Sequence, residues 1–184
     1  MQITLIRHGK PILPPSRWLA PYEMAQWIAA YDQSLVETTT IPAASFAACS
    51  GATIIFASTL ARAMSSASAL GHHAPCIDAV FREAALPFPL WRFPRLPAPL
   101  WAALFRLSWL LGYSRGADAL ASVTARARNA SALLVAGAAD GRVLLIGHGV
   151  MNRLIARELR AAGWTGTGMH GSGYWSTVSL KSPG

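Results

Sequence analysis

The sequence predicts an α/β protein built as a three-layer α/β/α sandwich around a mostly parallel central sheet. Apolar runs that suit strands alternate with helical stretches of roughly 10 to 15 residues each. One of these runs, residues 142–147, is almost continuously apolar and lies between glycines, as the central strands of parallel sheets do. The 184 residues fit one compact domain, 1–184, and contain no internal repeat.

The flanking elements follow from local patterns. Helices are expected over about 21–33 and about 117–138, the second because apolar residues recur there at helical spacing. A strand at the edge of the sheet, or next to the edge, is expected over 174–180. His72 and His73 follow a helix end and are expected to cap it. His170, in a glycine-rich stretch, is a candidate pocket or loop residue.

Two histidines follow strand-like runs and precede glycine. His8 comes after Arg7 at the end of an N-terminal apolar run, and His148 comes after the run 142–147. Open α/β folds bind ligands at the carboxyl edge of the sheet, so both side chains are expected there. We expect the two strands to be neighbours. The alternative for His148 is a buried structural histidine.

A third element ends at the same predicted edge. The apolar run 52–57 leads into Ser58, a predicted N-cap, and Gly71 is the predicted stop of the helix that follows. Arg62 would then lie in the first turn, where free amide groups and the helix dipole favour an anion. Taken alone, Arg62 could equally be a solvated helix residue.

These pieces, in this order, resemble the histidine phosphatase superfamily, also called phosphoglycerate mutase-like, in its small bacterial phosphatase branch. The resemblance runs from Gln2 to about Gly163. It implies a cofactor-independent enzyme that acts on a small phosphorylated substrate. The residues that it assigns are the nucleophile His8, the second pocket histidine His148, the proton donor Glu83, and the phosphate-binding Arg7, Arg62 and Gly149.

The chemistry of these residue types agrees with that assignment. A neutral imidazole can attack phosphorus and form a phosphohistidine. A guanidinium offers a planar fork that binds two phosphate oxygens. A carboxylic acid can give the leaving group its proton. Glu83 has an alternative as a surface ion pair with Arg82, and the residues downstream of it depart from the family pattern.

The segment that departs from the family pattern is 86–113. It is rich in proline and tryptophan, and its helical part is apolar on nearly every face. A buried cap helix or a homodimer contact is the expected role. The sharper alternative is an apolar lid for a substrate with an apolar leaving group. Another is a contact with a membrane surface, edged by Arg92, Arg95 and Arg115.

Other functions find little support in the composition. The net charge of +8 comes from basic residues spread singly along the chain, so we expect no nucleic-acid partner. Cys49 and Cys76 lack the spacing of metal ligands, and we expect no metal site. Two cysteines without close pairing, and no segment typical of a signal peptide, predict a cytoplasmic protein.

The sequence therefore predicts a phosphatase that works through phosphohistidine. A non-catalytic protein that binds a phosphorylated ligand or partner on the same fold is the alternative from another class. A phosphatase of protein phosphohistidine is a second alternative. A mutase is disfavoured, because mutases of the family are typically longer and carry extra segments that enclose the substrate.

Overall fold

The computed structural model describes residues 1–13, 18–166 and 173–183. Within them lies a five-stranded sheet in the order β4-β3-β6-β1-β7, in which β7 alone runs antiparallel to its neighbour. The strands are β1 (Gln2–Arg7), β3 (Ile54–Ser58), β4 (Cys76–Asp78), β6 (Arg142–Gly147) and β7 (Thr177–Lys181). The predicted neighbours, β1 and β6, pair in parallel.

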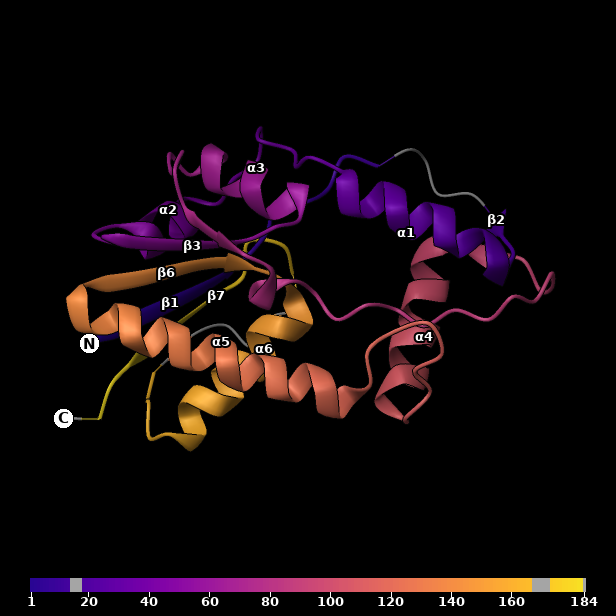
Figure 1. Ribbon diagram of the computed structural model, residues 1–184. Helices are drawn as coiled ribbons and strands as arrows, with labels where there is room; N and C mark the ends of the chain where they lie inside the picture. Colours follow the sequence, from indigo (N-terminus) through magenta and orange to yellow (C-terminus); the bar gives the residue numbers. More distant parts are fainter. Residues whose placement is uncertain (14–17, 167–172, 184) are drawn as a thin grey trace.

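Helices cover both faces of the sheet (Figure 1). The α helices are α1 (Met24–Gln33), α2 (Ala43–Cys49), α3 (Ala61–Ala69), α4 (Ala98–Leu110), α5 (Leu120–Asp140) and α6 (Gly149–Ala161). α5 and α6 pack on the face that carries Leu5 and Leu145, whereas α2 and α3 pack on the face that carries Ile6 and Ile146. The predicted three-layer sandwich is therefore confirmed.

A smaller unit extends from one end of the sandwich, away from the two termini (Figure 1). It consists of α1, α4 and a two-stranded sheet of β2 (Trp18–Leu19) and β5 (Leu96–Pro97). Its own apolar core gathers Met24, Trp101 and Phe105. The predicted helix of segment 86–113 is α4, which buries only one of its faces.

Some predicted boundaries move. The helix expected over 21–33 begins with a 3₁₀ turn, η1 (Pro21–Glu23), before α1. Helix α5 runs Leu120–Asp140 instead of about 117–138, and β7 starts at Thr177, after a turn at 173–175. Strand β4 is followed directly by a second 3₁₀ turn, η2 (Ala79–Phe81).

The prediction that Ser58 is the N-cap of α3 is wrong. Its backbone continues β3 and pairs with Asp78, so the helix begins three residues later, with Leu60 in the cap position. The Ser58 hydroxyl still accepts a hydrogen bond from the backbone N–H of Leu60, at 3.3 Å. Gly71 has φ of +85°, which suits glycine, and it ends the helix as predicted.

Among the residues that the structure describes, no helix has the length and the apolar character needed to cross a bilayer.

The apolar core between the sheet and the helices predicts how core substitutions change the stability of the protein. Leu145 of β6 is completely buried, so Leu145→Ala should lower the free energy of unfolding by roughly 2 to 5 kcal/mol. Leu133→Ala on the exposed side of α5 serves as the control and should change it by well under about 1 kcal/mol. Urea denaturation followed by circular dichroism measures both values. Equal losses in the two variants would contradict the placement of the core.

Candidate active site

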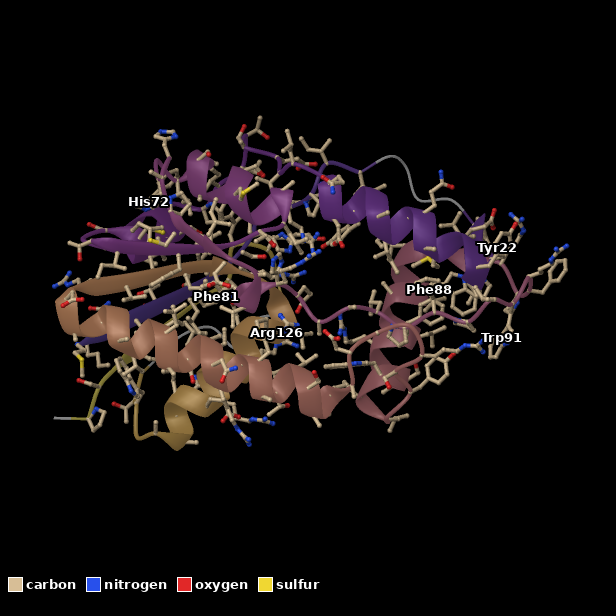
Figure 2. All side chains as sticks on the ribbon, in the orientation of Figure 1. Tyr22, His72, Phe81, Phe88, Trp91 and Arg126 are labelled. Carbon is tan, nitrogen blue, oxygen red and sulfur yellow. The ribbon has the colours of Figure 1, made fainter. Side chains whose placement is uncertain are left out.

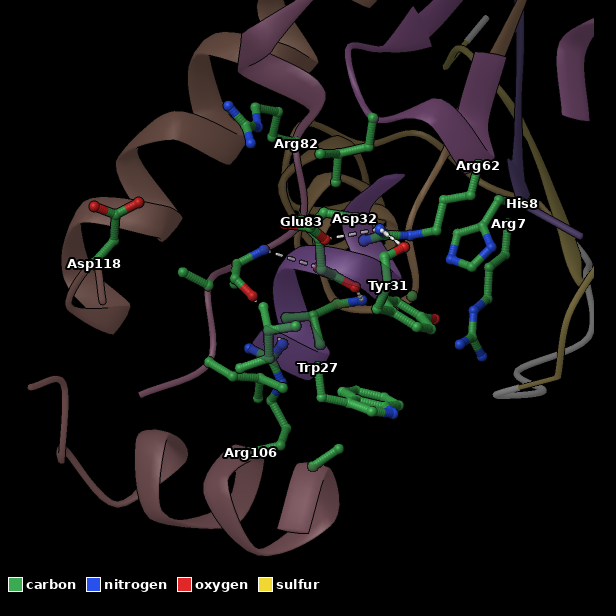
Figure 3. A pocket seen from close by; sticks show the side chains of 18 of the residues that line it. Arg7, His8, Trp27, Tyr31, Asp32, Arg62, Arg82, Glu83, Arg106 and Asp118 are labelled. Carbon is green, nitrogen blue, oxygen red and sulfur yellow. Dashed lines mark hydrogen bonds and ion pairs between the residues drawn. The ribbon is translucent and has the colours of Figure 1, made fainter. Parts of the chain in front are cut away.

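A cavity of about 930 Å³ lies between the sandwich and the smaller unit (Figure 3). Its walls come from β1, α1, α3, α4, the start of α6 and the segment after η2. It brings together five of the six predicted site residues, namely Arg7, His8, Arg62, Glu83 and Gly149. The sixth, His148, lies behind His8, with ring centroids 5.1 Å apart.

His8 directly follows β1 and is 2% exposed. Burial and the positive charge of Arg62 lower the pKa of His8 to about 3, with a smaller contribution from Arg7. The ring is therefore neutral at physiological pH. Its Nδ1 lies 2.8 Å from the carbonyl oxygen of Gly9, and because a carbonyl can only accept, Nδ1 carries the proton. The lone pair is then on Nε2, the nitrogen that could attack phosphorus.

The glycine after His8 is required by its surroundings. The ring of Trp175 packs so closely on Gly9 that a Cβ at this position would overlap it. The Gly9 N–H donates to the hydroxyl of Ser66 at 2.9 Å, and that hydroxyl donates to the carbonyl of Arg62 at 2.6 Å. This chain of hydrogen bonds ties the His8 turn to α3.

Arg62 is the second residue of α3 and is 2% exposed. Its Nη1 donates to a carboxylate oxygen of Asp32 at 2.8 Å and to the carbonyl of Tyr31 at 3.1 Å. The guanidinium also lies over the ring of Tyr31, 4.4 Å from its centre. The alternative of a solvated helix residue is wrong, because a buried cation needs partners of this kind.

Two tyrosines that the sequence did not single out flank His8. The ring centroids of Tyr31 and Tyr174 lie 6.4 and 5.7 Å from that of His8. The Arg7 guanidinium carbon lies 4.6 Å from the centre of the Tyr174 ring. Burial, with Tyr174 nearby, raises the pKa of Tyr31 to about 12, so its phenol keeps its proton and stays available as a donor.

His148 is completely buried, and neither ring nitrogen has a hydrogen-bond partner among the described residues. Burial and the positive charge of Arg62 hold its pKa well below the usual range, so the ring is neutral. Buried polar nitrogens are nearly always hydrogen-bonded in folded proteins. A phosphoryl oxygen bound beside His8 would supply the missing acceptor.

Glu83 occupies the amino end of α6. One carboxylate oxygen accepts the N–H of Val150 at 3.1 Å, and the other accepts those of Met151 and Ala84 at 3.1 and 3.0 Å. No ion pair with Arg82 is found within the described parts of the chain, so that alternative is not supported. Glu83 thus caps α6, which starts at Gly149, a contact that no local pattern indicated.

His170, the loop candidate, lies outside the described residues.

Solved structures with this architecture are known. The chain is similar to a mycobacterial glucosyl-3-phosphoglycerate phosphatase complexed with VO3, at 20% identity and a TM-score of 0.64, over 98% of this chain and 92% of that one. It is also similar to mycobacterial hydrolase 2, at 22% identity and a TM-score of 0.61, over 100% and 84%. A third similar structure is a phosphoglycerate mutase from Thermus thermophilus, at 21% identity and a TM-score of 0.52, over 89% of this chain and 85% of that one.

The fold of this chain is therefore that of the histidine phosphatase superfamily, as the motifs predicted. No family model matches the sequence, and no curated protein matches it.

The buried neutral imidazoles predict that stability falls in acid. The folded pKa of His8, about 3, lies below the unfolded value of 6.5, so the unfolded chain binds more protons between these values. The free energy of unfolding should then decrease as the pH falls from 6.5 towards 3, by up to about 1.4 kcal/mol per pH unit from this group.

Urea denaturation at a series of pH values measures this slope. His8→Asn should flatten it, whereas Leu133→Ala, on the exposed side of α5, should leave it unchanged. A slope that is identical in wild type and His8→Asn would contradict the proposed protonation state.

Proposed function

We propose that the protein is a phosphatase that hydrolyses a phosphomonoester through a phosphohistidine on His8. The observation that carries the proposal is the state of this imidazole. It is buried and neutral, it has Nδ1 tied to the Gly9 carbonyl, and it lines a cavity together with Arg7 and Arg62. This leaves Nε2 as a lone pair next to two permanent cations, which is what attack on a phosphoryl group requires.

In the first step, Nε2 of His8 attacks phosphorus, an N–P bond forms, and the ester P–O bond breaks. The guanidinium groups of Arg7 and Arg62 balance the charge of the phosphoryl oxygens. His148 donates one hydrogen bond to such an oxygen, which satisfies a ring nitrogen that has no partner among the described residues. Gly149, the first residue of α6, lines the same cavity and is the proposed further contact of the phosphoryl group, while Glu83 accepts the N–H groups of Val150 and Met151.

Glu83 is the proposed proton donor to the departing alkoxide. It lines the cavity, and its oxygens accept the N–H groups of Val150 and Met151 in the first turn of α6. In the second step, water attacks the phosphohistidine, the N–P bond breaks, and the Glu83 carboxylate takes the proton of that water. Inorganic phosphate and neutral His8 are regenerated, so the cycle needs no cofactor.

The solved structures support an activity of this kind. One similar protein is a glucosyl-3-phosphoglycerate phosphatase that binds VO3, and another is a phosphoglycerate mutase. Vanadate species resemble phosphate in shape and charge, so the first similarity supports an anion site at the corresponding edge of this sheet. The two similarities together support phosphatase or mutase chemistry. We favour hydrolysis of a small phosphorylated substrate.

His8→Asn tests the nucleophile. The asparagine amide can still donate to the Gly9 carbonyl but offers no ring nitrogen, so turnover of a phosphomonoester panel should fall about a thousandfold or more. Acid quenching of the wild type during turnover should trap an acid-labile phosphoprotein that is absent from the variant. His73→Asn is the matched control and should keep both the label and the activity.

Three outcomes would contradict the proposal. A label that persists in His8→Asn would place the nucleophile elsewhere. Transfer of phosphate between hydroxyl groups without release of inorganic phosphate would indicate a mutase. A wild type that binds vanadate but turns over no member of the panel would favour the non-catalytic binding protein.

Glu83→Gln separates proton donation from helix capping. A general acid matters most for a poor leaving group, so the variant should lose about a hundredfold or more in kcat/KM on alkyl phosphates. It should lose much less on p-nitrophenyl phosphate, whose leaving group needs no proton. If kcat/KM falls by the same factor on both substrates, Glu83 acts only by holding α6 in place. Thermal unfolding reports the loss of the cap separately.

A further inference from the structure

Helix α4 has three faces with different surroundings. Ala98, Trp101, Phe105 and Trp109 are buried in the protein. Pro99, Ala102, Ala103 and Arg106 line the cavity. The third face carries Leu100, Leu104, Leu107 and, directly after the helix, Leu111. These leucines recur every three or four residues, so they form one stripe along the helix.

The leucine stripe is exposed to solvent. Leu107 is 55% exposed and Leu111 is 81% exposed, and Leu100 and Leu104 also belong to the exposed class. Neither the core of the smaller unit nor the cavity uses this stripe. Contiguous apolar surface of this kind marks a contact with a partner or with a membrane.

The loop that leads into α4 exposes further large apolar side chains. Leu90 is 67% exposed and Phe93 is 76% exposed, and Trp91 is exposed as well. Trp91 lies at the end of the molecule that also holds α4, far from the sheet (Figure 2). We call the four leucines of the stripe the docking face, and Leu90, Trp91 and Phe93 are further exposed apolar side chains of the loop that precedes the helix.

The charged residues of the segment that carries the docking face are all basic. Between Glu83 and Asp118 the chain has no acidic residue, and it has four arginines. Arg92, Arg95 and Arg115 are exposed. Arg95 lies 3.4 Å from Glu23, whereas no ion pair is found for Arg92 or Arg115 within the described residues.

We propose that the docking face binds the surface of an anionic lipid bilayer. Exposed leucine, phenylalanine and tryptophan side chains insert among acyl chains and headgroups, and arginines at the margin pair with lipid phosphates and carboxylates. The net charge of +8 acts in the same direction over a longer range. This activity is separate from the proposed phosphatase chemistry and does not depend on it.

A second copy of the chain is the competing occupant, because the spacing of the leucines also suits helix pairing. A two-fold contact, however, would bring each arginine of the margin close to the same residues of the other copy. The segment offers no carboxylate to balance them. The charges therefore favour an anionic bilayer over self-association.

Vesicle cosedimentation tests the proposal with the full chain. Vesicles with about 30 mol% phosphatidylserine should bind the wild type about tenfold or more tightly than vesicles of phosphatidylcholine alone, and added salt should weaken this preference. Leu104→Ser/Leu107→Ser should reduce binding to both vesicle types by about tenfold. Arg92→Gln/Arg115→Gln should reduce only the preference for phosphatidylserine.

Leu133→Ser, at an exposed position of α5, is the matched control and should bind as the wild type does. The substituted leucines of α4 do not line the cavity and are exposed, so an unchanged far-UV circular dichroism spectrum and melting temperature in the double variant show that it has folded. Absence of wild-type binding to phosphatidylserine vesicles would overturn the proposal. A dimer that dissociates in Leu104→Ser/Leu107→Ser, without vesicle binding, would assign the face to a second copy.

Discussion

The parallel pairing of β1 with β6 is the constraint on which the site depends. Its register places Arg7 opposite Gly147, so the next residues, His8 and His148, leave the sheet at the same edge and on the same face. A slip of one residue would turn one histidine to the other face and would exchange the apolar side chains that the two helical layers contact. The pattern that buries Leu5 with Leu145 therefore also sets the 5.1 Å between the imidazoles.

Of the four basic side chains at this edge of the sheet, the two arginines carry positive charge and the two histidines are neutral. Burial, together with the positive charge of Arg62 and Arg7, lowers the pKa of His8 and of His148 and keeps both rings neutral. The permanent charge thus lies on groups that cannot attack, while the lone pairs lie on groups that can. Asp32 balances part of the charge of Arg62, so an arriving phosphate has to share this cation with a carboxylate.

Much of this site is visible in the sequence because strand, histidine and glycine are adjacent along the chain. The partners of those residues are not. Tyr31 and Asp32 contact Arg62 from the last turn of α1, about thirty positions away, so only tertiary packing brings them together. The capping of α6 by Glu83 joins positions still farther apart, and Ser58 failed as an N-cap because pairing with β4 outweighed its local preference.

The segment 86–113 shows a different limit. A helix that is apolar all round predicts burial but does not tell which face is buried. In α4 the small side chains of Ala102 and Ala103 face the cavity, whereas the large leucines face solvent. Stability alone favours the opposite arrangement, because burying a leucine removes more apolar surface from water than burying an alanine. The alanines leave room for a ligand, and the leucines provide an apolar surface that the described chain does not cover. The sequence of α4 is thus shaped by two surfaces outside the core.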